Sequence, residues 1–364
     1  QKPILEIGRL IEAARKNEWE KLEQMIAWIT HNAEQEIYIN SLVRLMRNCR
    51  DDRKWPLMIG LLENNPSPLV RSSAAAALGD FLTQESISAL LKAAEDPSRL
   101  VRIRAAFALA SVPQGYLTAA QKKAFEKAKV EFLESTTVMP TNWTSQFNRG
   151  VFQMAAGQFT KAIEAFETAH KLRPDVLPPL INIAIAANIA GNNELAEQSL
   201  RKALQSHPDS DAVHLNLGLL LAEQQRYTEA QKAFRDALQI NDKLAAAAYN
   251  LAVILSAEDI TEAVYWARKA YENAPEQHRY GYTYALYLNQ ANRSEEATAV
   301  LETLVDQNSN YAPVYHLLGY IYCTHGRIDE GLALFNKGLH NDDIRSDEKV
   351  RHRSSWPNSI VPGS

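Results

Sequence analysis

The sequence predicts an all-α fold built from stacked helix pairs, and three observations lead to this prediction. The second half of the chain repeats a helix-turn-helix pattern every 34 residues, shortened once to 33. The first half carries a different repeat, spaced 31 residues. Runs of β-branched residues that would indicate strands are few. Since one helix pair cannot bury its own apolar face, repeats of this length stack into a solenoid.

The 34-residue pattern is defined by two columns of small residues, which allow the backbones of paired helices to approach. The first column is Gly150, Ala184, Gly218, Ala252, Ala285 and Gly319. The second is Ala162, Ala196, Ala230, Ala263, Ala297 and Gly331. The second helix of each pair then carries one larger residue in most repeats: Phe166, Leu200, Phe234, Ala267, Leu301 and Phe335.

Glycines and prolines mark where these helices end. A turn glycine recurs as Gly157, Gly191 and Gly326, and a proline that cannot continue a helix follows as Pro174, Pro208 and Pro275. The fourth repeat is one residue short, and its turn at 256–261 has no glycine. A tighter turn is expected there.

These columns resemble tetratricopeptide repeats. The resemblance implies a right-handed α-solenoid with a concave face, lined by the first helix of each pair, that binds other proteins. Six such repeats are expected over residues 143–345, followed by a polar tail at 346–364.

The 31-residue pattern shows at residues 65–71, Asn-Pro-Ser-Pro-Leu-Val-Arg, and 96–102, Asp-Pro-Ser-Arg-Leu-Val-Arg. Each is followed by an alanine-rich run. The pattern resembles HEAT repeats, with a degenerate copy at Ile39, Leu42 and Val43 and a weaker one over two helices around 4–15 and 18–30.

The predicted fold is therefore an all-α solenoid of HEAT-like helix pairs over residues 1–112, followed by the six tetratricopeptide repeats. Residues 113–142 form a junction helix and linker, because Thr118 suits an N-cap and Phe125, Ala128 and Phe132 follow at helical spacing.

Composition and motifs argue against catalysis. The net charge of −4 gives no basic face for nucleic acid, and no apolar run approaches the ~18 residues of a membrane span. Phosphate-binding, dinucleotide and haem-attachment motifs do not occur, and the nine histidines show no metal-ligand spacing. No enzyme activity, cofactor or metal is predicted. Cys49 and Cys323 are expected to be unbridged thiols.

Candidate partner-binding residues come from two columns of the first helices, together with one basic residue. They are Phe147, Asn148, Asn182, Asn216, Tyr249, Asn250, Arg279, Tyr282 and His316. Asparagine amides offer donors and acceptors to the backbone of an extended peptide, although they could instead satisfy groups of neighbouring helices. Lysine and arginine are absent from the first column, so a clamp for a terminal carboxylate is not expected. The expected ligand is an extended segment bearing apolar or aromatic side chains, or the chain's own tail.

The order of the parts resembles the C-terminal region of bacterial multihaem cytochrome c proteins fused to tetratricopeptide repeats. That resemblance implies a periplasmic or otherwise exported protein that assembles subunits of a respiratory redox complex; a cytoplasmic location is the alternative. The chain could also be the haem-free portion of such a cytochrome. A third hypothesis is self-assembly through the C-terminal edge, unless Trp356, Ile360 and Val361 fold over it. The start at Gln1 suits either a processed protein or a fragment.

The repeat frame can be tested by overpacking. Ala230→Leu is expected to destabilise the fold by about 1–3 kcal/mol, because a larger side chain would enter a close helix contact. Thermal unfolding measures the loss, and unchanged stability would contradict the frame.

Overall fold

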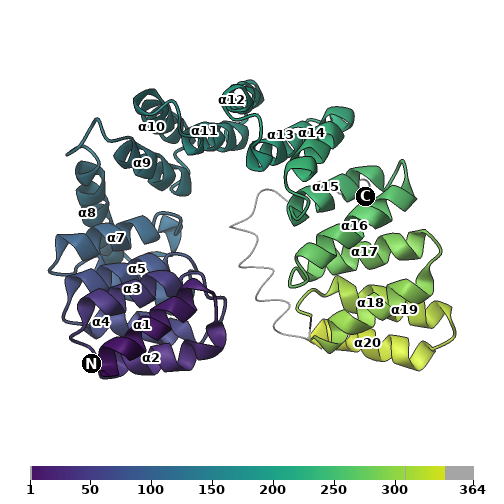
Figure 1. The fold of residues 1–364 in the computed structure, drawn as a ribbon, viewed down its shortest axis with the longest axis horizontal. Coiled ribbons are helices and arrows are strands. Elements are labelled where there is room, and N and C mark those ends of the chain that lie inside the picture. Colours follow the sequence, from purple (N-terminus) through teal and green to yellow (C-terminus); the bar gives the residue numbers. More distant parts are fainter. Residues whose placement is uncertain (1, 308, 341–364) are drawn as a thin grey trace. The chain divides into compact units, whose positions relative to one another are not determined.

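The computed structural model describes residues 2–307 and 309–340. Within these ranges every regular element is a helix and no strand occurs (Figure 1). The prediction of an all-α solenoid fold is confirmed. The chain divides into two compact units between Ala190 and Gly191, and each is described by itself.

The first unit contains the HEAT-like helices, the junction helix and the first three helices of the 34-residue pattern. Its elements are α1 (Lys2–Arg15), η1 (Trp19–Lys21), α2 (Leu22–His31), α3 (Glu36–Met46), α4 (Lys54–Asn64), α5 (Pro68–Leu78), α6 (Gln84–Ala93), α7 (Arg99–Ala108), η2 (Gln114–Tyr116), α8 (Ala119–Ser135), α9 (Trp143–Ala155), α10 (Phe159–Leu172) and α11 (Pro178–Ile189).

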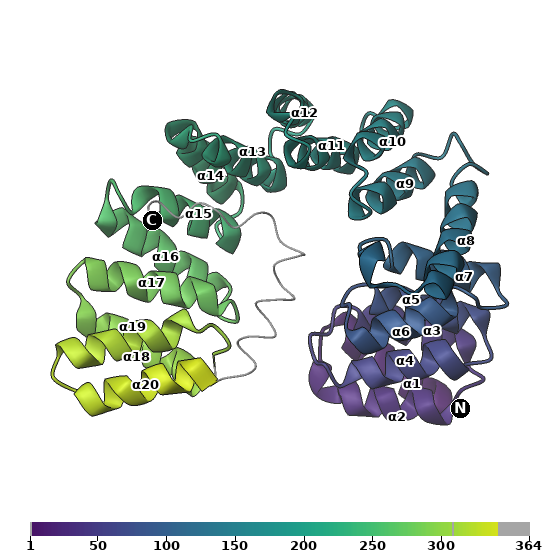
Figure 2. The same ribbon diagram turned by 180° about the vertical axis from the view of Figure 1, so that it is seen from behind.

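The second unit, coloured from green to yellow in Figure 2, continues the pattern. Its elements are α12 (Asn193–Ser206), α13 (Asp211–Glu223), α14 (Tyr227–Ile240), α15 (Ala245–Leu255), α16 (Ile260–Asn273), α17 (His278–Gln290), α18 (Ser294–Asp306), α19 (Pro313–Thr324) and α20 (Ile328–His340). The helices α9–α20 correspond to the six predicted pairs. The predicted tail at 346–364 lies outside the described residues, and the division at 112 and 142 stays a prediction.

Alanines let the HEAT-like helices α5 and α7 pack closely. Ala74, Ala75, Ala105 and Ala106 are fully buried. The degenerate copy is helix α3, whose Ile39, Leu42 and Val43 are likewise buried, as its periodicity predicts. Small side chains at these sites allow a short distance between helix axes, so each helix of this row buries one stripe and leaves the opposite stripe exposed.

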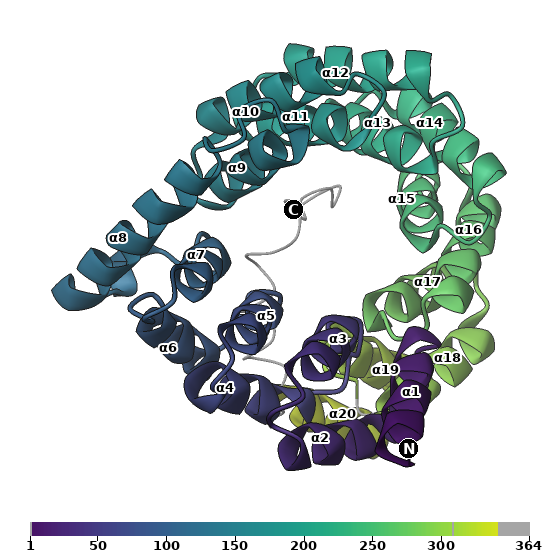
Figure 3. The same ribbon diagram turned by 60° about the vertical axis from the view of Figure 1, so that its left-hand side comes forward.

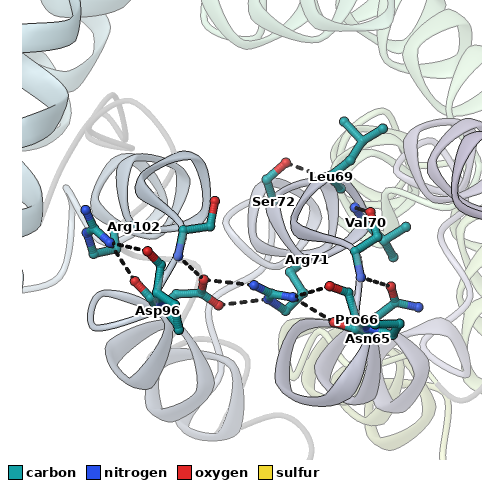
Figure 4. A network of polar contacts seen from close by, with 11 residues as sticks. Asn65, Pro66, Leu69, Val70, Arg71, Ser72, Asp96 and Arg102 are labelled. Atoms are coloured by element: carbon teal, nitrogen blue, oxygen red, sulfur yellow. Dashed lines mark hydrogen bonds and ion pairs between the residues drawn. The ribbon is translucent and has the colours of Figure 1, made fainter.

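The arginine of each Val-Arg motif ties one HEAT-like repeat to the next (Figure 4). Arg71 donates from Nε and Nη2 to the Asp96 carboxylate at 2.8 and 3.0 Å, and from Nη1 to the carbonyls of Asn65 and Pro66. One repeat later, Arg102 donates to the Glu131 carboxylate and to the carbonyls of Asp96 and Pro97 in the same way. The motif is therefore structural: it closes each loop and joins neighbouring repeats.

Helix α8 continues the HEAT-like stack, because Glu131 on α8 supplies the carboxylate that Asp96 supplies one repeat earlier. Thr118 caps α8 as predicted, and its hydroxyl accepts from the Gln121 N–H. Phe132 of α8 packs against Phe152 of α9, with ring centroids 4.7 Å apart. This contact joins the junction helix to the first 34-residue repeat.

Within a 34-residue pair, the small residue of the first helix lies under the large residue of the second. A Cβ added at Gly218 would lie 2.5 Å from Cε1 of Phe234, and one at Gly150 would lie 2.5 Å from Cε1 of Phe166. The fifth pair instead has the larger Ala285 with the smaller Leu301, both fully buried. The two residues of a pair are therefore matched in size. Ala230, in the second small column, is also fully buried.

The turns confirm the role of the recurring glycines. Gly157, Gly191 and Gly326 adopt φ of +71°, +80° and +82°. Gln225 and Asn292 occupy the same place in two other repeats, with φ of 60° and 59°. The fourth repeat has no left-handed residue in its turn, where the Asp259 carboxylate caps α16 instead. The residue deleted from the short repeat is thus the left-handed one, which explains the tighter turn.

The size match predicts coupling between two substitutions. Gly218→Ala should destabilise the fold by about 1–3 kcal/mol, because the new methyl group has no room beside the buried Phe234 ring. Adding Phe234→Leu, which copies the fifth pair, should recover part of that loss. Chemical unfolding of the single and double variants measures the coupling, and additive effects would contradict the size match.

A control comes from Gly60 in the middle of α4, where an added Cβ meets nothing within 4 Å. Gly60→Ala should stabilise the fold by about 0.5–1 kcal/mol through helix propensity alone.

The Arg71–Asp96 pair predicts a loss of stability in acid. Burial opposes ionisation of Asp96, but hydrogen bonds from Arg71 and the Ser98 N–H and the charges of Arg71 and Arg102 outweigh it, so the Asp96 pKa is lowered. A lowered folded pKa adds stability that is present above the unfolded pKa, about 3.9, and lost as the pH falls through the folded pKa. Asp96→Asn should therefore cost about 2 kcal/mol at neutral pH.

The cost of Asp96→Asn should shrink below about pH 4, where the wild-type carboxyl protonates. Urea unfolding across the pH range measures it. Glu12→Gln, which removes an exposed pair with Lys16, is the control and should cost about 0.5 kcal/mol or less. A cost for Asp96→Asn that does not change with pH would contradict the role of the ionised carboxylate.

Candidate functional site

The predicted binding residues are divided between the two units. Phe147 and Asn148 lie on α9 and Asn182 lies on α11, all in the first unit. The second unit holds the rest: Asn216 on α13, Tyr249 and Asn250 on α15, Arg279 and Tyr282 on α17 and His316 on α19. Figure 3 shows the odd-numbered helices α13, α15 and α17 of this unit in one layer and α14, α16 and α18 in the other.

Tyrosines connect α15, α17 and the segment before α19. The ring of Tyr249 stacks on that of Tyr280, with centroids 4.7 Å apart, and Arg279 lies over Tyr249 at 5.0 Å. Tyr282 meets Tyr311 edge-on at 5.4 Å. All four rings are partly exposed. We call the surface made by Asn216, Tyr249, Asn250, Arg279, Tyr280, Tyr282 and Tyr311 the odd-helix face.

The phenol groups of this face stay protonated at neutral pH. Burial raises the pKa of Tyr280 and of Tyr282, and the neighbouring Tyr249 raises both further. A protonated phenol offers one O–H donor and an acceptor oxygen. The face therefore presents hydrogen-bonding groups at the edges of apolar rings, a combination common where proteins bind other proteins.

The asparagine column behaves alike in three repeats. Nδ2 of Asn182, Asn216 and Asn250 donates to the carbonyl four residues earlier in its own helix, at 2.9, 2.7 and 2.7 Å. This bond orients each amide and leaves it one N–H and the Oδ1 acceptor. Asn148 is exposed. The column thus has a structural role and keeps groups that a ligand could use.

The helices of the odd-helix face carry very little charge. The sequences of α15, α17 and α19 contain no Asp, Glu or Lys, and Arg279 is their single arginine. The second helices of the same repeats are rich in charge: Arg268 on α16, for example, pairs with Glu272 at 2.7 Å. Charged side chains have been placed on the opposite layer, so the odd-helix face suits an uncharged ligand.

Other predicted positions are less suited to binding. Phe147 packs against Trp143 and against Phe166, the ring that fills the space over Gly150. His316 is exposed and lies edge-on to Phe335 at 5.9 Å. Two cavities in the first unit, one of about 340 Å³ around Phe125 and Phe152 and one of about 450 Å³ around Leu62 and Ala89, contain none of the predicted residues.

Sequence reasoning missed Tyr280 and Tyr311, which complete the aromatic contacts of this face. The signal was present, since α17 reads His-Arg-Tyr-Gly-Tyr-Thr-Tyr at its start. Tyr280 lies outside the repeat columns that were compared, so the column analysis passed over it. A count of tyrosines per helix would have found it.

Chemical groups for catalysis or metal binding do not gather in the described part of the chain. Across residues 2–307 and 309–340, no group of three or more His, Cys, Asp or Glu side chains could hold a metal ion. Cys49 and Cys323 are free thiols. None of the described helices is both long and apolar enough to cross a bilayer.

Family models match both halves of the chain. Residues 55–122 match the model for HEAT repeats, and residues 183–245 match a tetratricopeptide repeat model. Tetratricopeptide repeats generally bind other proteins and are typically non-catalytic.

Individual proteins are similar over shorter or more distant stretches. Protein O-mannosyl-transferase TMTC3 of Homo sapiens and of Mus musculus are each 28% identical over 148 residues, which is 36% of this chain and 16% of theirs. The chain thus spans about a sixth of the length of these curated relatives. A tetratricopeptide repeat protein from Parabacteroides merdae has a TM-score of 0.43 and 20% identity, covering 62% of this chain and 93% of its own.

A structure of pilF from Pseudomonas aeruginosa has a TM-score of 0.47 and 18% identity, covering 57% of this chain and 96% of its own. The family matches and the helix pairs together make this chain a repeat protein that carries both HEAT repeats and tetratricopeptide repeats.

Proposed function

We propose that this chain is a non-enzymatic scaffold that binds other proteins, and that the odd-helix face holds an extended, uncharged segment of a partner. The observation that supports the proposal best is the stack of Tyr249 on Tyr280 beside helices without carboxylates. Aromatic side chains supply most of the binding energy in many protein interfaces because they bury large areas at little entropic cost.

The mechanism divides the work between rings and amides. Apolar or aromatic side chains of the partner pack on Tyr249, Tyr280 and Tyr282. The free amide groups of Asn216 and Asn250 and the tyrosine hydroxyls bond the partner's backbone, which has one donor and one acceptor at most residues. A strongly charged segment would lose hydration here without finding an opposite charge, apart from Arg279.

At a finer level, we propose that the partners are subunits of a respiratory redox complex in the periplasm or another exported compartment. The order of HEAT-like repeats before tetratricopeptide repeats supports this idea. A haem-free portion of a multihaem cytochrome and a self-assembling subunit are the alternatives. The C-terminal segment that would cap or expose the last helix pair for self-assembly lies outside the described residues.

The asparagine column provides the first test. Asn182→Ala combined with Asn216→Ala should weaken partner binding about tenfold while helicity is kept, since each loss removes a bond to the partner backbone. Affinity capture with quantitative mass spectrometry and circular dichroism measure the two effects. A variant that unfolds, or that binds every partner as the wild type does, would contradict a role in binding.

Matched tyrosine variants sharpen the same experiment. Tyr280→Leu should lose the partners of the odd-helix face, whereas Tyr265→Leu on α16, whose side chain is 50% exposed, should keep them. Captured cytochromes or oxidoreductase subunits that depend on Tyr280 would support the redox proposal. Capture of the chain alone, with light scattering that grows with concentration, would favour self-assembly and contradict the scaffold proposal.

A further inference from the structure

The HEAT-like helices of the first unit present a second surface with different chemistry. The exposed stripe of α3 begins with Ile37, that of α5 with Leu69 and that of α7 with Leu100. These three side chains are 67%, 38% and 44% exposed and take equivalent places in successive repeats. In Figure 4 Leu69 points away from the Arg71–Asp96 network, so it lies on the side of α5 that the loop contacts leave open.

Two arginines without carboxylate partners lie on the same stripes. Arg44 on α3 and Arg104 on α7 are both exposed, and no ion pair in the described residues includes either. Arg71 and Arg102, by contrast, each hold a carboxylate and two carbonyls. Arg44 and Arg104 are therefore not needed to join the repeats.

The positive charges are close enough to repel one another. Burial lowers the pKa of Arg104, and the charges of Arg47 and Arg44 lower it further. Of these three arginines only Arg47 has a salt-bridge partner among the described residues, because its guanidinium donates to the Asp80 carboxylate at 2.6 and 2.7 Å. Such a cluster favours a ligand that brings negative charge.

A polar contact holds the stripes of α3 and α5 in register between the apolar and the basic ends. The Ser73 hydroxyl donates to Oδ1 of Asn40. At the apolar end, the Glu36 carboxylate accepts from the Ser67 hydroxyl at 2.6 Å and lies on the loop side. We call Ile37, Arg44, Leu69, Leu100 and Arg104 the HEAT face. It is a row of apolar side chains beside a basic patch.

We propose that the HEAT face binds an acidic amphipathic helix of another protein. Neighbouring packed helices lie about 8–10 Å apart, and seven residues of an α-helix span about 10.5 Å. A partner helix crossing the stripes can therefore place one apolar residue per heptad on each of Ile37, Leu69 and Leu100. Its acidic flank then meets Arg44 and Arg104. This surface and the odd-helix face bind different chemistry, so the inference does not depend on the proposed function.

The test uses the full chain and labelled peptides in fluorescence anisotropy. The probe is a three-heptad helix with Leu at one position of each heptad and Glu on one flank. Comparison peptides carry Gln in place of Glu, or Glu alone without Leu, and a single-stranded DNA represents an anionic ligand of another class. The Leu-Glu helix should bind at least about tenfold more tightly than the Leu-Gln helix and the all-Glu peptide.

Variants locate the binding. Arg44→Glu with Arg104→Glu should abolish binding of the Leu-Glu helix and create binding of a matching Leu-Lys helix, and Leu69→Ser should weaken the Leu-Glu helix about tenfold. Arg99→Gln, an exposed arginine off the stripe of α7, and Val130→Ser on α8 are the controls and should change nothing.

The reciprocal gain for the Leu-Lys helix keeps the result interpretable, because an unfolded variant could not produce it. Equal binding of the all-Glu and Leu-Glu peptides would overturn the apolar half of the proposal. Tighter binding of DNA than of the Leu-Glu helix, or no binding of the Leu-Glu helix, would overturn the proposal as a whole.

Discussion

The close approach of two helices at one small residue is the constraint on which the repeats depend. Gly150 and Gly218 leave room for the phenylalanine rings that lie within 2.5 Å of where their Cβ atoms would be. A large side chain on the second helix fills this space, and a small one on the first creates it. Because protein interiors are packed at crystal-like density, the two positions can vary only together. The fifth pair shows this with Ala285 and Leu301.

The same constraint creates the surfaces that face partners. Each helix that buries a small-residue stripe on one side exposes the other side, and stacking repeats aligns these exposed stripes in rows. The rows then acquire chemistry at no cost to the core. In the second unit they are aromatic and almost uncharged around Tyr249 and Tyr280. In the first unit they combine Leu69 and Leu100 with Arg44 and Arg104. A scaffold gains from such a difference, because each surface discriminates against the partner of the other.

Most of the fold could be predicted from the sequence, because repeat spacing is a strong signal. The small-residue columns gave the helix pairs, and Gly157, Gly191 and Gly326 gave the left-handed turns. Gln225 and Asn292 could not be found in this way, since they adopt a conformation that their residue type rarely takes. The backbone of the repeat imposes it on them.

The candidate site was harder to predict than the fold. Columns name equivalent positions but not the contacts between neighbouring helices, so Tyr280 and Tyr311 escaped notice although they touch predicted residues. The Val-Arg motif drew attention as a signature, yet Arg71 serves the loops and its neighbour. The arginines left free for a ligand, Arg44 and Arg104, stand outside that motif. Whether a charge is paired depends on three-dimensional packing that a single sequence does not display.

The central claim is that partners bind the exposed stripes of the odd-numbered helices. Hydroxyl-radical footprinting of the full chain, with and without a captured partner, measures this directly through the oxidation of individual tyrosines. We expect the partner to protect Tyr249, Tyr280 and Tyr282, while Tyr227 and Tyr265 on α14 and α16 oxidise at unchanged rates. Protection of Tyr227 and Tyr265, with Tyr249 and Tyr280 unaffected, would place the partner on the opposite layer and contradict the account.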